Sequence, residues 1–123
     1  MSSLFSNPER LSLLTFGLFF ANFLFNVISN ASFKYSAQSP NWNGIIAWQI
    51  AGNLAGFITV ITLTLLLRNT TLNIVYPVTA GLSVVGVQVF AAWLLFHEPI
   101  SPVKWIGTLL IVLGIVLIGA QSK

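Results

Sequence analysis

Four long stretches of this chain contain almost no charged residues, and this feature constrains the fold more than any other. The stretches cover residues from about 11 to 34, 44 to 67, 72 to 96 and 102 to 120. A helix needs about 20 predominantly apolar residues to cross the hydrocarbon core of a bilayer. Backbone groups in lipid must satisfy their own hydrogen bonds, so we expect each stretch to form a transmembrane helix.

The charged residues are few, and they fall near the ends of these stretches. The 123 residues include five Lys/Arg and two Asp/Glu, which is 6% of the chain, whereas an ordinary soluble domain has about 25%. So few charges exclude a soluble globular domain, and the scattered basic residues exclude a nucleic-acid binder. We predict an all-α integral membrane protein, with residues 1–123 forming a single domain of four transmembrane helices and short loops.

Two questions of topology follow from the first helix and from the positions of Lys and Arg. The first stretch is longer than the core of a usual signal peptide and more apolar chain follows it, so we expect a retained helix, with cleavage as the alternative. Four helices place both termini on one side, together with Arg10, Arg68 and Lys123. The other side holds Lys34 and Lys104, and this small difference predicts cytoplasmic termini.

Uncharged polar residues recur at helical spacing inside two of the predicted spans. Asn22, Asn26 and Asn30 are four residues apart in the first span, and Gln49 and Asn53 repeat the spacing in the second. Side chains at this spacing share one face of a helix. Because a buried amide needs partners, we expect both stripes to face inward, where they line a substrate path or simply hold helices together.

Acidic residues are absent from the predicted spans. Exporters that couple cation efflux to proton uptake use a membrane carboxylate, so this chain lacks the usual coupling group. Glu98 lies at the membrane edge beside His97, the one histidine of the chain. This pair either meets a head group or orders the loop at a helix end. One histidine and no cysteine give no metal-binding or acid–base cluster, so we predict no enzyme activity, cofactor or metal.

Small residues indicate close helix packing. Gly107 and Gly114 lie seven positions apart on one face of the last helix, and small residues let helices approach closely in lipid. We predict that this face is the dimer interface. Gly52 and Gly56 form a similar pattern in the second helix, where packing within the subunit is an equal alternative.

Several segments resemble the small four-helix proteins of the drug/metabolite transporter superfamily, which include the small multidrug resistance proteins. The resemblance is closest to the subunits thought to flip undecaprenyl-phosphate-aminoarabinose across the bacterial inner membrane. It spans most of the chain and is strongest from residue 73 onward. The segments that carry it are Asn73–Pro77, Leu95–Pro102, Trp105–Gly107 and Gly114–Val116.

The resemblance also implies roles for single residues. The signature membrane glutamate of the multidrug exporters corresponds to Asn26 here, and the lysine eight positions later corresponds to Lys34. The exporters' tyrosine in the third helix corresponds to Tyr76, and their glycine seam to Gly107 and Gly114. Asn26 in place of glutamate argues against proton-coupled drug efflux and agrees with the flippase subunits, which also lack this acid.

The predicted function is translocation of a polyprenyl-phosphate-linked sugar or a similar amphipathic lipid across the bacterial inner membrane. The subunit would act as a homodimer or with a second four-helix subunit, with both termini in the cytoplasm. Amides would bind the polar head group, while Lys34 and His97 would meet the phosphate. The alternatives are an exporter of organic cations and a non-transporting scaffold subunit. The predicted substrate-binding residues are Asn22, Asn26, Asn30, Lys34, Gln49, Asn53, Tyr76, His97 and Glu98.

Overall fold

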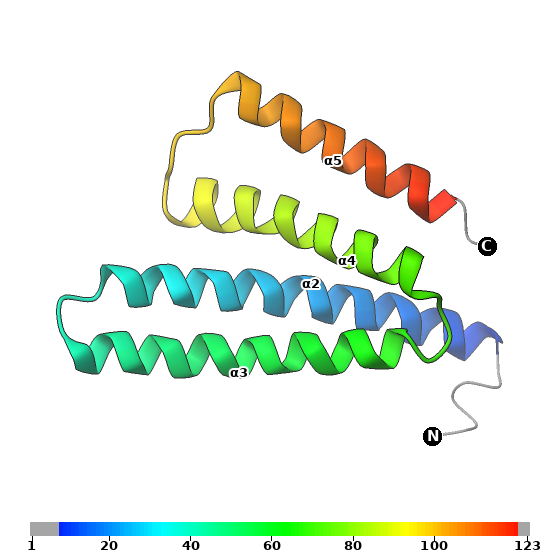
Figure 1. Cartoon of the computed structure of the whole chain (residues 1–123), viewed down its shortest axis with the longest axis horizontal. Helices are drawn as coiled ribbons and strands as arrows, with labels where there is room; N and C mark the ends of the chain where they lie inside the picture. The colour runs from blue at the N-terminus through cyan, green and yellow to red at the C-terminus, as the bar shows by residue number, and fades with distance from the viewer. Residues whose placement is uncertain (1–7, 121–123) are drawn as a thin grey trace.

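The computed structural model describes residues 8–120 and their side chains from residue 12 onward, so Lys123 lies outside the described residues. This part of the chain is all-helical (Figure 1). With the labels of Figure 1, its elements are α2 (Pro8–Gln38), α3 (Trp42–Leu66), α4 (Leu72–Gly86), its π-helical continuation η1 (Val87–Leu95) and α5 (Pro102–Ala120).

Four helical segments are long and apolar enough to cross a membrane. They contain 19 to 27 residues each, and the second half of the third segment is η1. This confirms the predicted all-α membrane fold with four spans. The segments are Ser12–Gln38, Trp42–Leu66, Leu72–Leu95 and Pro102–Ala120.

The helices α2 and α3 form a closely packed antiparallel hairpin (Figure 1). Asn41 begins α3 by accepting a hydrogen bond of 2.9 Å from the Gly44 N–H, which satisfies one of the free backbone donors at a helix start. Further along, Gly52 is buried against the ring of Phe33. The small residues of α3 therefore pack within the subunit, which decides between the two alternatives for this helix.

The third span changes its hydrogen bonding part-way along. It continues as an α-helix through Pro77 and becomes the π-helix η1 at Val87. At the end of η1 the Phe96 N–H bonds to the carbonyl of Ala91, five residues back, at 2.9 Å. The sequence predicted one regular helix over 72–96, because an apolar run carries no signal for this wider turn.

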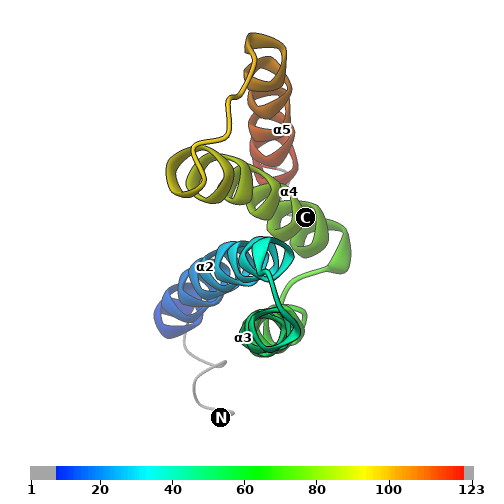
Figure 2. The same ribbon diagram turned by 90° about the vertical axis from the view of Figure 1, so that its left-hand side faces the viewer.

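The helix α5 lies on the opposite side of α4 from the α2–α3 hairpin (Figure 2). Among the described helices its backbone approaches only α4, where Ile111 and Ile115 meet Gly81. Thr108 is the one buried residue of α5. Most of the surface of α5 is therefore open in a single subunit.

The two ends of the molecule differ in composition. The α2–α3 and η1–α5 connections lie at one end, and the α3–α4 connection lies at the other, beside the start of α2 and the end of α5 (Figure 1). All four tryptophans are in helical turns near the end that holds the α2–α3 and η1–α5 connections. The rings of Trp93 and Trp105 are in edge-to-face contact there, with ring centres 5.5 Å apart. Tryptophan collects at membrane–water interfaces, so this end is a membrane boundary rich in aromatic side chains.

Candidate functional site

Asn22 is the centre of the polar contacts between α2 and α3. Its side chain is buried, with 3% of its surface exposed. The Nδ2 group donates to the Thr59 carbonyl at 3.0 Å and to Thr62 Oγ1 at 3.1 Å. Asn26 Nδ2 in turn donates to Asn22 Oδ1 at 3.0 Å. Asn22 therefore holds two helices together and also fixes the orientation of the next amide along α2.

A cavity of about 220 Å³ lies where α2, α3 and α4 meet. Among the described residues no side chain donates to Asn26 Oδ1, so this oxygen is available to a group inside the cavity. The wall from α4 contains hydroxyl groups on a single helical face. The polar lining consists of Asn22, Asn26, Thr59, Tyr76, Thr79 and Ser83, and the apolar lining of Val60, Leu63 and Ala80.

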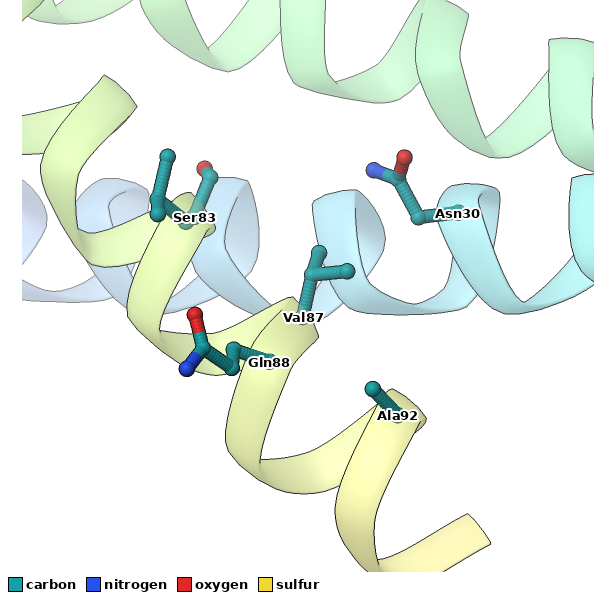
Figure 3. Close-up of a pocket in the computed structure, with 6 residues that line it drawn as sticks. Asn30, Ser83, Val87, Gln88 and Ala92 are labelled. Atoms are coloured by element: carbon teal, nitrogen blue, oxygen red, sulfur yellow. The ribbon is translucent and has the colours of Figure 1, made fainter. Parts of the chain in front are cut away.

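A second cavity of about 440 Å³ lies between α2 and the α4–η1 junction. Asn30 reaches it from α2, while the other lining residues follow one another along α4 and η1 (Figure 3). Ser83 lines both cavities, so they are neighbours on α4, and together they are named the polar path. Gln88 and Ala92 contribute to the wall of the second cavity from η1. The full lining is Asn30, Ser83, Val84, Val87, Gln88 and Ala92.

An apolar groove of about 400 Å³ also runs between α2 and α4. Its lining has no polar side chain and is dominated by aromatic rings. The lining residues are Phe16, Phe19, Phe20, Phe23, Val78 and Leu82.

Lys34 and Glu98 form an ion pair at the tryptophan-rich end, with 3.4 Å between Nζ and Oε2. Both side chains are almost half exposed. His97, next to Glu98, has a backbone φ of 55°, in the left-handed region that few residues other than glycine adopt. The side chain of His97 is exposed. The unusual feature of this residue is therefore its backbone conformation.

The amides of α3 lie apart from these cavities. Gln49 and Asn53 are exposed in the subunit, so the expectation that this stripe faces inward is wrong for the single chain. Gln49 Nε2 reaches Ser36 Oγ at 3.3 Å, and Asn53 Nδ2 donates to the Gln49 carbonyl at 2.7 Å. The stripe on α2 faces inward at Asn22 and lines the cavities further along.

Sequence reasoning named Tyr76 but missed the threonines of the site. The Thr59 carbonyl and the Thr62 hydroxyl accept hydrogen bonds from the Asn22 amide, and Thr79 lies in the cavity wall. A signal was present, because Tyr76, Thr79 and Ser83 follow each other at spacings of three and four residues. That spacing places polar side chains on one helical face, as for the asparagines.

The glycines predicted to form the dimer interface have no neighbours within the subunit. A side chain added at Gly107 or Gly114 would meet no described atom within 4 Å. Packing inside the subunit therefore does not explain these glycines. The dimer interface itself remains a prediction. In residues 8–120, no three His, Asp or Glu side chains come together as a metal site would require.

Comparison with known proteins assigns most of the chain to one family. The family model described as Small Multidrug Resistance protein matches residues 14–111. This region contains most of α2, all of α3, α4 and η1, and the first half of α5. Neither the curated proteins nor the solved structures give a match.

Proposed function

The chain belongs to the small multidrug resistance family, and on this premise we propose that it translocates a polyprenyl-phosphate-linked sugar or a similar amphipathic lipid. As a member of this family with four spanning helices it is a small multi-pass membrane transporter. The finer proposal concerns the substrate, and it depends on the chemistry of the two polar cavities.

The observation that carries the proposal is that the polar side chains in the described lining of both cavities are amides and hydroxyls, set among apolar ones and with no charged side chain. An organic cation inside a membrane needs an opposite charge, whereas a sugar needs hydrogen-bond partners. Asn26 offers a free carbonyl oxygen at the position where the resemblance places the exporters' glutamate. Asn30 and Gln88 extend the same chemistry into the second cavity.

The apolar groove and the ion pair suit the other two parts of such a substrate. The apolar groove lies between α2 and α4, helices that also contribute to the first polar cavity, so an isoprenoid chain in the bilayer can lie against these helices while the head group enters. Lys34 lies one helical turn beyond Asn30 at the membrane edge, where a cation would meet the phosphate. The predicted contact of His97 with the phosphate is an alternative to a role through its backbone turn, and the His97→Gly variant distinguishes the two.

A dimer completes the proposed transporter. The surface of α5 around Gly107 and Gly114 is open, and in lipid such surfaces allow close helix contact. The partner is a second copy or a related four-helix subunit. We place the protein in the bacterial inner membrane with both termini in the cytoplasm. With no acid in the described spans for coupling, transport follows the supply and consumption of the lipid.

The test is a flipping assay in liposomes with a fluorescent polyprenyl-phosphate-linked sugar of short chain length. The wild type, alone or with a second four-helix subunit, accelerates flipping. Asn26→Leu reduces the rate about tenfold, because a hydrogen bond to the head group is lost. Asn53→Leu is the matched control, since Asn53 is an exposed amide outside both cavities, and it keeps the rate. Absence of acceleration with or without a partner subunit contradicts the proposal.

The family description itself favours a second candidate, an exporter of organic cations. Proton release when a quaternary ammonium compound is added to the purified protein would support that candidate and contradict the lipid substrate. A scaffold subunit, the third alternative, would co-purify tightly with one large partner. It would keep its function in the Asn26→Leu variant.

A further inference from the structure

The Lys34–Glu98 ion pair joins α2 to the segment after η1, close to the second polar cavity but outside its lining. Lys34 lies one turn after Asn30 on α2, and the Glu98 N–H donates to the carbonyl of Ala92 on η1 at 2.8 Å. Asn30 and Ala92 are opposite walls of that cavity. The contact of 3.4 Å between the two charged groups therefore links both walls at the membrane edge.

The position of Glu98 is set by the backbone rather than by side-chain packing. His97 turns the chain with its positive φ, and the Glu98 N–H then reaches back six residues to the end of the π-helix. Such a left-handed residue is a common way to end a helix and satisfy its last carbonyls. The turn thus holds a carboxylate over the end of α2.

The pair is accessible and weakly held. The side chains of Lys34 and Glu98 are 45% and 46% exposed, and exposed ion pairs contribute little because water competes for both partners. A lysine ammonium also has three donor hydrogens. A second anion at this edge can therefore compete with Glu98 for the ammonium of Lys34.

Three aromatic rings contact one another on the segments that carry the ion pair. Tyr35, next to Lys34, stacks on Trp48 with ring centres 4.7 Å apart, and its other neighbour is Phe96 at 4.9 Å. Phe96 lies two residues before Glu98. Movement of η1 away from α2 would therefore separate the rings of Tyr35 and Phe96 and alter the surroundings of Trp48.

We propose that Glu98 is an internal counter-ion of Lys34, and that a phosphate anion takes its place and opens the cavity at this edge. The inference rests on the proposed function, because it identifies how an anionic amphiphile would enter the path. Its chemistry is that of a phosphate group, from either a lipid head group or free phosphate. Lys34 is the ligand, and His97 is a positioning residue that acts through Glu98.

The test is a titration of the protein in neutral detergent micelles, with Trp48 as the only tryptophan after phenylalanine replaces the other three. The probe is dodecyl phosphate, and inorganic phosphate is titrated separately. We expect saturable binding that changes the Trp48 fluorescence. Glu98→Gln binds dodecyl phosphate about threefold more tightly, because the competing carboxylate is gone, and its fluorescence before titration already resembles that of the phosphate-bound protein.

The controls separate the site from general attraction of an anion to a basic protein. Lys34→Gln weakens binding about tenfold, since a charged hydrogen-bond donor is lost, and Lys34→Arg retains it. Lys104→Gln, at the same membrane edge, leaves binding unchanged. The proposal is overturned if Lys34→Gln and Glu98→Gln titrate like the wild type, or if Lys104→Gln loses as much affinity as Lys34→Gln.

The arms of the experiment also identify the source of the phosphate and separate the two proposals. Binding of dodecyl phosphate alone supports a lipid head group, and equal binding of inorganic phosphate supports free phosphate. The probe carries no sugar and the assay measures no transport. A protein that binds phosphate at Lys34 and fails in the flipping assay would contradict only the proposed function.

Discussion

The two halves of this subunit are held together by different contacts. Within residues 12–120, five side-chain hydrogen bonds join α2 to α3. Ser29 Oγ, for example, donates to the Gly52 carbonyl at 2.8 Å, and Ser36 Oγ to the Ile45 carbonyl at 2.8 Å. The hydroxyls of α4 and α5 bond instead to carbonyls of their own helices, as in Thr79 and Thr108.

The difference matters because the hydrophobic effect does not drive helices together in lipid. Close packing of small residues and interhelical hydrogen bonds do so instead. The α2–α3 hairpin has both, and we interpret it as the rigid part of the subunit. The α4–η1–α5 half also has close small-residue contacts, at Gly81 against Ile115 and at Gly86 against Phe23, but its hydroxyls bond within their own helices. Both polar cavities lie against this half. It is the half that can move or pack against a partner.

The largest expected effect comes from Gly52→Leu, which tests the rigidity of the hairpin. A Cβ at Gly52 would lie 2.5 Å from Cε1 of the Phe33 ring, so the two helices must separate. We expect a loss of about 2 to 3 kcal/mol of stability, measured as a lower Tm in detergent. Gly17→Leu, on an open part of α2, is the control and keeps its Tm. Equal stability of the two variants would show that the hairpin is not close-packed.

The next effect concerns the α4–η1–α5 half, named the open half because most of the surface of α5 is exposed. Gly114→Leu meets no atom within the subunit, so the Tm of the single chain in detergent should not fall. If α5 forms the dimer interface, the added side chain blocks close approach and weakens dimerisation about tenfold or more. Cross-linking in liposomes at decreasing protein-to-lipid ratios measures this change. Gly17→Leu again serves as the control, and a dimer unaffected by Gly114→Leu would place the interface elsewhere.

The sequence was sufficient to predict the spans and the α2 side of the site, for physical reasons. Charged residues cannot remain in the bilayer core, so Lys34, Arg68 and Glu98 lie at helix ends. The repeat of Asn22, Asn26 and Asn30 follows the helical period, and this alone puts them on one face. That face does line the cavities.

The remaining features depend on how the helices rotate about their axes and which pairs touch. Gln49 and Asn53 have the same spacing as the asparagines, yet α3 turns its small residues toward α2 and leaves these amides exposed. The Lys34–Glu98 pair joins residues far apart in the sequence. The π-helix that carries Gln88 of the second cavity has no sequence signal in an apolar run.

Asn22→Leu tests whether hydrogen bonds contribute to the rigidity of the hairpin. The change removes the donors to Thr59 and Thr62 and the acceptor for Asn26. We expect a loss of about 1 kcal/mol, at the upper range for polar contacts between membrane helices. Thermal unfolding in detergent measures it. Asn30→Leu is the comparison, because Asn30 is exposed and bonds only within α2, and a similar loss in both variants would contradict the interhelical role of Asn22.

The smallest effect is expected at the end of η1, where His97→Gly tests whether the backbone of the open half is strained. Relief of the positive φ should gain about 1 kcal/mol, since left-handed geometry costs about 1 to 2 kcal/mol outside glycine. The added freedom of glycine in the unfolded chain removes about 0.5 to 1 kcal/mol of this gain. The net change is therefore a stabilisation of a few tenths of a kcal/mol, visible as a slightly higher Tm. His97→Val cannot adopt this turn easily and lowers the Tm.

The same glycine variant tests the proposed role of His97 as a positioning residue. If His97 acts through its backbone turn, His97→Gly keeps phosphate binding at Lys34. If the imidazole contacts the phosphate directly, His97→Gly loses phosphate binding.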